Sequence, residues 1–454
     1  MKNAFFWLES PKFSKNPTRK TLYFHSKNRG KTLFLSKKIC KKTLFLSEKT
    51  CKKRLFFALF LMFFAGIFAL FCIVLPSKNC ALAADKTQEE IKKEFEGSVV
   101  DVINGLDLKA LQEFLDSIGG EQGEALSIED LKATLKALVS GEPQNFYRNF
   151  LTLLSKSAGR YFLAFAPSFI TIMVICLLKN MLCSLTSDFL NNSTSEVVHT
   201  VCYSAIVIVL MSGIAGIVKT VGDTIDSMTR FANLIFPLLL TLLSTLGATV
   251  TVAGYSPLMA VFCSVILKIV GAVVLPAFVA CIVFCVVGNV SKTVKLDKLA
   301  KLVKSAASWL VGIVFGLFAT FLTVQGVTGG AVDKFGFNVA KFAVSSYVPV
   351  LGGYLSDGLD LLSASVVLVK NALGYVGAIV LCSLVLFPIV KVVIFSLTLK
   401  LTSAVCEPLG DSRTSNLLFS ASKNMNLLVS ALAGAAFAFF LLIMLLISSC
   451  NMGV

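Results

Sequence analysis

Residues 231–267 read FANLIFPLLLTLLSTLGATVTVAGYSPLMAVFCSVIL, which is 37 residues without a charged side chain. A helix needs roughly 20 apolar residues to cross the hydrocarbon core of a bilayer. The stretch is therefore too long for one crossing, and Gly247, Gly254 and Pro257 mark where it must turn. It predicts a chain that folds in lipid.

Five more stretches have no charged residue and reach spanning length: 197–218, 269–291, 305–332, 371–390 and 424–454. A shorter apolar run at 161–178, ended by Lys179, predicts one further span. The chain is 56% hydrophobic and 15% charged with a mean hydropathy of +0.81, outside the usual mix of soluble domains. We expect an all-α, polytopic integral membrane protein whose multi-span domain covers 161–454. Lys268 and Pro276 leave open whether 256–291 is one bent helix or two short ones.

The net charge of +16 is concentrated in a basic tail. Residues 1–54 hold 16 Lys or Arg against Glu9 and Glu48, so the other 400 residues carry only about +2. This distribution argues against a nucleic-acid-binding face on the folded part. The tail repeats with a period of eleven, as in 31–36 and 42–47, and we interpret it as a disordered low-complexity segment. A tail bound to an anionic membrane surface is the alternative.

A secretory signal pattern follows at 55–83. Lys52, Lys53 and Arg54 precede the apolar run 55–75, and Ala81-Leu82-Ala83 offers a cleavage point. Whether this segment is a cleaved signal peptide or an uncleaved signal anchor stays open. Both versions predict that the next residues lie outside the cytoplasm.

Residues 84–160 have the composition of a water-soluble segment, with many acids and with apolar residues at helical spacing. We expect a small extracytoplasmic region of two or three short amphipathic helices. Its acids lack the alternating spacing of a calcium loop, which favours a solvated face.

Five lysines alternate with apolar residues over 291–304, which predicts either an interfacial helix or a basic loop on the cytoplasmic side. Residues 326–362 are broken by glycines, and we expect either a re-entrant element that lines a path or an extracytoplasmic loop with amphipathic helices. Asp357, Asp360 and Lys370 are the candidate path-lining residues, because a charge at bilayer depth is costly unless it is paired or hydrated. Lysines that reach from helix ends to the headgroups are the alternative explanation.

Motifs for catalysis or cofactor binding do not emerge from the sequence. The two histidines are His25, in the basic tail, and His199, near a predicted helix end, so the sequence assembles neither a histidine-based metal site nor a hydrolase triad. No phosphate-binding glycine loop is present. Cys281 and Cys285 share a helix face, but a pair without further ligands is better explained by apolar packing. We expect no cofactor, no metal and no enzymatic activity.

Several short motifs occur in a recognisable order. They are 236–243 (FPLLLTLL), 324–328 (VQGVT), 340–345 (AKFAVS), 347–353 (YVPVLGG), 355–357 (LSD) and 407–411 (EPLGD). In this order the chain from about residue 84 onward resembles the stage III sporulation protein AE family of endospore-forming bacteria.

The resemblance implies a role in spore development. Members of this family belong to a multi-protein channel that connects the mother cell with the engulfed forespore and serves specialised secretion or feeding. The implied location is the mother-cell membrane around the forespore. The implied partners are the bilayer, the other proteins of the stage III sporulation A operon and a forespore membrane protein. The operon proteins include an ATPase and ring-forming components. Whether the chain also forms a homo-oligomer stays open. The family carries no catalytic residues onto this chain.

An independent permease for a small solute or ion is the second hypothesis. In that case the glycine-broken segment with Asp357 and Asp360 would form the binding element, and internal repeats are expected.

Overall fold

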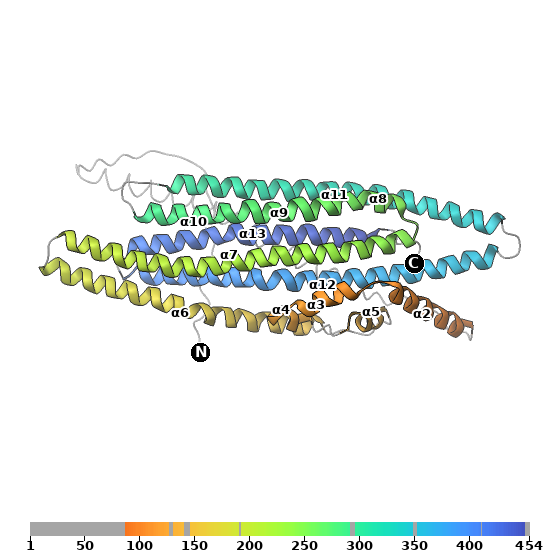
Figure 1. Cartoon of the computed structure of the whole chain (residues 1–454), viewed down its shortest axis with the longest axis horizontal. Helices are drawn as coiled ribbons and strands as arrows, with labels where there is room; N and C mark the ends of the chain where they lie inside the picture. The colour runs from red at the N-terminus through yellow and green to blue at the C-terminus, as the bar shows by residue number, and fades with distance from the viewer. Residues whose placement is uncertain are drawn as a thin grey trace, which may run out of the picture. The chain divides into compact units, whose positions relative to one another are not determined.

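The computed structural model describes residues 87–126, 130–139, 146–189, 192–290, 296–347, 352–409 and 411–449. Every described residue lies within one compact unit, Ala81–Val454. The basic tail and the signal pattern at 55–83 lie outside the described residues. Within these residues every regular element is a helix (Figure 1), as the sequence predicts.

Four short helices come first, where the sequence predicts two or three. They are α2 (Thr87–Gly105), α3 (Lys109–Ser117), α4 (Gly120–Leu126) and α5 (Leu131–Val139). The predicted amphipathic character is confirmed for α3, which buries Leu111 and Leu115, and for α5, which buries Leu131 and Leu135. These helices pack along α12 and α7, so protein covers part of the apolar surface of those two helices.

Five long helices form the body of the bundle. They are α6 (Phe146–Phe189), α7 (Asn192–Thr245), α11 (Asp297–Tyr347), α12 (Gly352–Cys406) and α13 (Ser412–Ser448). The expectation that Lys179 ends a span is wrong, because α6 continues through it, and α7 likewise continues through Lys219 at the end of the charge-free run 197–218. At a rise of about 1.5 Å per residue, α7 and α12 are each about 80 Å long. They therefore extend well beyond a hydrocarbon core of about 30 Å.

The predicted turn within 231–267 is confirmed at Gly247. Its φ of +74° lies in the left-handed region that favours glycine. The turn reverses the chain between α7 and α8 (Thr249–Val261). Gly254 and Pro257 lie inside α8 and make no turn.

One continuous helical rod follows the turn. It consists of α8, the π-helical stretch η1 (Phe262–Ile266), α9 (Leu267–Ile269), a second π-helical stretch η2 (Val270–Val274) and α10 (Leu275–Val290). The backbone stays in the right-handed helical region at each junction from η1 to η2. The question left open by Lys268 and Pro276 is thus settled in favour of one helix with two wide turns.

Two polar segments are parts of long helices. Residues 297–304 are the first turns of α11 and continue into its apolar part, so the expectation of a separate interfacial helix is wrong. Residues 326–347 and 352–362 are helical parts of α11 and α12, and the expectation that this segment lines a path or lies outside the cytoplasm stays a prediction. Figure 1 shows α11 and α12 side by side toward their shared end.

The core is built around α12 and α13. In the most apolar part of α12, 72% of the residues are buried, compared with 11% in α6. Phe439 of α13 lies at the centre of an aromatic cluster, 4.8 Å from Phe236, 5.5 Å from Phe262 and 5.6 Å from Phe231 between ring centroids. Side chains thus fill the space between α7, the rod and α13.

Glycines allow the closest approaches of these helices. A Cβ at Gly377 of α12 would lie 2.4 Å from Cδ1 of Ile235, and one at Gly434 of α13 would lie 2.7 Å from Cδ2 of Phe315. Small residues at such crossings are the usual means by which membrane helices pack closely.

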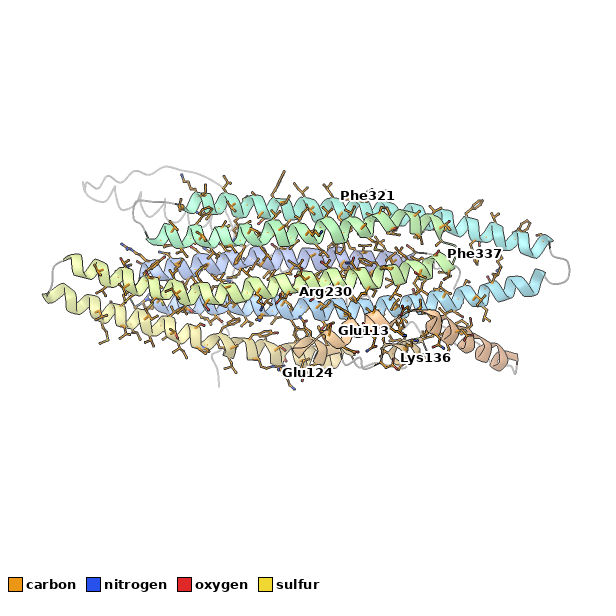
Figure 2. All side chains as sticks on the ribbon, in the orientation of Figure 1. Glu113, Glu124, Lys136, Arg230, Phe321 and Phe337 are labelled. Atoms are coloured by element: carbon orange, nitrogen blue, oxygen red, sulfur yellow. The ribbon has the colours of Figure 1, made fainter. Side chains whose placement is uncertain are left out.

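The outer helices expose apolar side chains, among them Phe321 of α11 (Figure 2). Six described segments are long and apolar enough to cross a membrane: Thr152–Leu182, Val197–Thr245, Leu267–Asn289, Lys298–Val324, Gly358–Cys406 and Ser412–Ser448. The described chain is therefore that of a multi-pass membrane protein.

Asp333 of α11 holds the start of α8. Its carboxylate oxygens accept hydrogen bonds from the backbone N–H groups of Val250, at 3.0 Å, and Thr251, at 2.7 Å. The side chain is buried, and the first N–H groups of a helix have no partner within the helix. Asp333 thus fixes α11 to the turn at Gly247.

Replacing Asp333 by Ala leaves these two N–H groups without their acceptor, so we expect a loss of about 1–2 kcal/mol of stability. Asp333→Asn retains one acceptor oxygen and should lose less. Thermal unfolding of the purified chain in detergent measures both effects. The exposed Asp223 of α7 provides the control, since Asp223→Ala should leave the unfolding temperature unchanged. If both alanine variants lowered the unfolding temperature equally, the role of Asp333 at the start of α8 would be contradicted.

Candidate functional site

A buried ion pair joins α6 to the turn between α12 and α13. Nζ of Lys179 lies 2.6 Å from Oδ2 of Asp411, and the two side chains are 7% and 4% exposed. Isolated charges are rarely buried, because desolvation costs several kcal/mol per ion. Their pairing therefore fixes α6 against the start of α13.

Asp411 is also the N-cap of α13. Its Oδ1 accepts a hydrogen bond from the Thr414 backbone N–H at 3.2 Å, and its Oδ2 accepts one from the Thr414 hydroxyl. Aspartate is among the preferred residues at this position because its oxygen satisfies an otherwise unpaired N–H group. One carboxylate thus starts α13 and binds the ammonium group of α6.

Two buried thiols lie next to this pair. Sγ of Cys176 on α6 is 3.2 Å from Sγ of Cys406, the last residue of α12, and 4.0 Å from Oδ2 of Asp411. The site therefore brings α6, the end of α12 and the start of α13 together within a few ångströms. We call Cys176, Lys179, Cys406 and Asp411 the helix-end cluster.

A pocket of about 270 Å³ opens beside the helix-end cluster. It is lined by Cys176, Lys179, Asn180, His199, Leu409, Asp411, Ser412 and Arg413. The lining is mainly polar and includes the start of α13. Its volume lies just below the roughly 300–1,000 Å³ that is usual for small-molecule sites.

The electrostatics of Asp411 are set by opposing effects. Burial alone would raise the pKa of its carboxyl group, but hydrogen bonds from Lys179 and Thr414 outweigh it and hold the pKa below its ordinary value. The carboxylate is thus charged at neutral pH. The stabilisation is present above the ordinary aspartate pKa and is lost as the pH falls through the lower folded-state value.

Chemically, this arrangement is suited to holding helices together. Among the described residues, no group of three or more His, Cys, Asp or Glu side chains could hold a metal ion. The ammonium and the carboxylate neutralise each other, and the carboxylate is further occupied by Thr414. The cluster is a positioning element for α6 and α13.

The sequence-predicted site residues lie elsewhere. Asp360 forms an ion pair with Lys341 of α11, and both side chains are partly exposed. Lys370, ten residues further along α12, is fully buried and donates to the backbone carbonyl of Ser449. Ten residues correspond to about 15 Å along a helix, so Asp360 and Lys370 form no common site. Asp357 belongs to α12, and its side chain lies outside the described part of the structure.

Sequence reasoning missed the helix-end cluster because its members are far apart in the chain. Lys179 was interpreted only as the end of a span. Asp411 closes the motif 407–411 and precedes a long apolar helix, which is the pattern of an N-cap. That signal predicts the cap, but it does not predict Lys179 as the partner.

The fold is that of a multi-pass α-helical membrane protein. Its long apolar helices pack around α12 and α13, and a buried ion pair joins the helix ends. A protein-family model described as stage III sporulation protein AE matches residues 129–450. The chain belongs to this family, as its short motifs predict.

A relative from Bacillus subtilis (strain 168), named stage III sporulation protein AE, is 25% identical over 347 residues. The similarity covers 76% of this chain and 87% of the relative. No solved structure matches the chain.

Removing one partner of a buried ion pair leaves an uncompensated charge and typically costs about 3–5 kcal/mol. We expect Asp411→Asn to destabilise the chain by an amount in this range, although asparagine can still cap α13. The double variant Lys179→Met with Asp411→Asn should recover much of the loss, because it removes both charges. Thermal unfolding in detergent checks this, and additive losses in the double variant would refute the pairing.

The thiol geometry makes a second prediction. Because the two sulfur atoms lie 3.2 Å apart, a mild membrane-permeant oxidant such as diamide should link Cys176 to Cys406. Mass spectrometry of the proteolysed chain should find the linked peptide pair. Cys202, on α7, is the control and should remain available to alkylation. Recovery of Cys176 and Cys406 as separately alkylated peptides would show that α6 and the end of α12 do not meet here.

Proposed function

We propose that this chain is a membrane subunit of the channel that connects the mother cell with the forespore during endospore development. The observation that carries the proposal is the family match over residues 129–450. It supports a sporulation role, and the channel assignment extends that role to a specific assembly.

The packing of the core favours an assembly subunit over an independent permease. A permease needs a solute path through its own fold, usually at the interface of structural repeats. Here Phe231, Phe236, Phe262 and Phe439 meet between α7, the rod and α13 and fill the centre of that helix group. A conduit is therefore better placed between this chain and other subunits.

The outer surface is consistent with such an assembly. The outer helices α6 and α11 carry large exposed apolar side chains, such as Leu163 at 70% and Leu317 at 68%. Exposed apolar surface of this kind is suited to lipid or to partner helices. Because α7 and α12 are far longer than a bilayer is thick, part of each lies beyond the hydrocarbon, where the chain's own short helices cover some of the surface and partners could cover the rest.

The proposed location is the mother-cell membrane that surrounds the forespore. The proposed partners are the other proteins of the stage III sporulation A operon, including its ATPase and ring-forming components, and a membrane protein of the forespore. In this role the chain is not an enzyme. The helix-end cluster then serves to keep the helices in register within the assembly.

Purification of the tagged full-length chain from sporulating cells tests the proposal. After mild solubilisation we expect the operon-encoded proteins to co-purify with the chain. The chain alone, reconstituted in vesicles, should release no entrapped ions or small solutes. Both results follow if the conduit forms only between subunits.

The control is an unrelated multi-pass protein with the same tag, purified from the same cells, to measure carry-over in detergent micelles. Solute flux through vesicles that contain only this chain would overturn the proposal in favour of a permease. Recovery of the chain without any operon-encoded partner, under conditions that preserve other membrane complexes, would also count against it.

A further inference from the structure

Four lysines from three different helices gather on one part of the bundle. They are Lys301 and Lys304 of α11, Lys400 of α12 and Lys423 of α13, and we call them the lysine cluster. Nζ of Lys304 donates to the backbone carbonyl of Lys423 and, at 3.1 Å, to Oδ1 of Asn424. Lys423 is exposed, and its Nζ lies 3.9 Å from the centre of the Phe419 ring.

The positive charges of the cluster repel one another. Lys301 lies one helical turn before Lys304 on α11, and Lys400 lies one turn beyond Ser396 of α12, whose hydroxyl donates to the backbone carbonyl of Ser422 on α13 at 3.0 Å. Among the residues whose side chains the structure describes, which leaves out Asp297 one turn before Lys301, no carboxylate forms an ion pair with Lys301, Lys400 or Lys423. Such a group of like charges is stabilised by an external anion.

The cluster lies where two helices lose their charged residues. From the cluster onward α11 has no charge over 305–332, and α13 has none from residue 424 to its end. Lysines at the boundary of an apolar run are placed at the level of the lipid headgroups. Anionic headgroups attract lysines there by roughly 1 kcal/mol each.

Apolar side chains surround the cluster in sequence and remain exposed. Leu302 follows Lys301, Leu401 follows Lys400, and Phe419 lies one helical turn before Lys423; their side chains are 64%, 43% and 43% exposed. A ligand that combines a phosphate with acyl chains satisfies both the lysines and this apolar surface. A free anion satisfies only the lysines.

We propose that the lysine cluster is a binding site for the phosphate headgroup of an anionic phospholipid. The phosphate lies between Lys301, Lys400 and Lys423, with the acyl chains along Leu302, Leu401 and Phe419. Lys304 holds α11 against α13 and so positions Lys301. The site does not depend on the proposed role in the channel, and it gives the chain a preference for anionic membranes.

The experiment compares lipids added to the purified full-length chain in detergent. Phosphatidylglycerol should raise the unfolding temperature, whereas phosphatidylcholine and inorganic phosphate at the same phosphate concentration should not. The triple variant Lys301→Gln, Lys400→Gln, Lys423→Gln should lose on the order of a hundredfold in apparent affinity for phosphatidylglycerol, about fivefold per lysine. The triple variant with Arg at these positions should retain binding.

Lys109→Gln, Lys132→Gln, Lys136→Gln is the matched control, because it removes the same charge from exposed positions on α3 and α5. This variant should bind phosphatidylglycerol like the unmodified chain. Equal affinity in the cluster variant and the unmodified chain would overturn the proposal. If inorganic phosphate stabilised the chain as much as phosphatidylglycerol does, the site would bind free anions. If a soluble poly-glutamate peptide did so, the site would bind an acidic protein. Either result refutes a lipid site.

A second measurement covers the case in which the glutamine variant does not fold. A photoactivatable phosphatidylglycerol, applied to the unmodified chain in mixed vesicles, should label peptides that contain Leu302, Leu401 or Phe419. Excess unlabelled phosphatidylglycerol should compete with this labelling, and excess phosphatidylcholine should not. Labelling spread evenly over the exposed faces of α6 and α11 would show that no specific site exists.

Discussion

The close approach of α12 and α13 to their neighbours is the constraint on which the rest of the bundle depends. A Cβ at Gly377 would come within 2.4 Å of Cδ1 of Ile235, so this side chain of α7 packs directly on the backbone of α12. At that separation the aromatic side chains around Phe439 fill the remaining space. In lipid, where no hydrophobic effect drives helices together, such contacts supply much of the association energy. The arrangement of α6, α11 and the rod follows from this central packing.

Carboxylates then fix the ends of the elements. Asp411 starts α13 and binds Lys179 of α6, while Asp333 of α11 satisfies the first turn of α8. In both cases one side chain joins two elements that are distant in the chain. Each also satisfies backbone N–H groups that would otherwise be costly to bury. The geometry thus favours a rigid framework.

The helical, multi-span character could be predicted from the sequence because long charge-free runs leave no alternative in lipid. The turn at Gly247 was likewise predictable from a run too long for one crossing. Helix ends were predicted less well, because single charges do not stop a helix: Lys179 pairs with Asp411 inside the bundle, and the side chain of Lys219 stays exposed. The glycines of 326–362 do not end the helices either: Gly336 lies inside α11 and Gly358 inside α12, each with open space beside it. The pairing of Lys179 with Asp411 joins positions 232 residues apart, which no local pattern reveals.

The two π-helical stretches in the rod change which of its residues face the neighbouring helices. A π turn takes one more residue than an α turn, so the residues beyond it are rotated by about one position around the axis. Between α8 and α10 this offset occurs twice, at Phe262–Ile266 and Val270–Val274. A strict heptad or 3.6-residue pattern therefore cannot hold across the whole rod. Its two halves can evolve their contact stripes independently, and one-residue insertions or deletions are best tolerated at these wide turns.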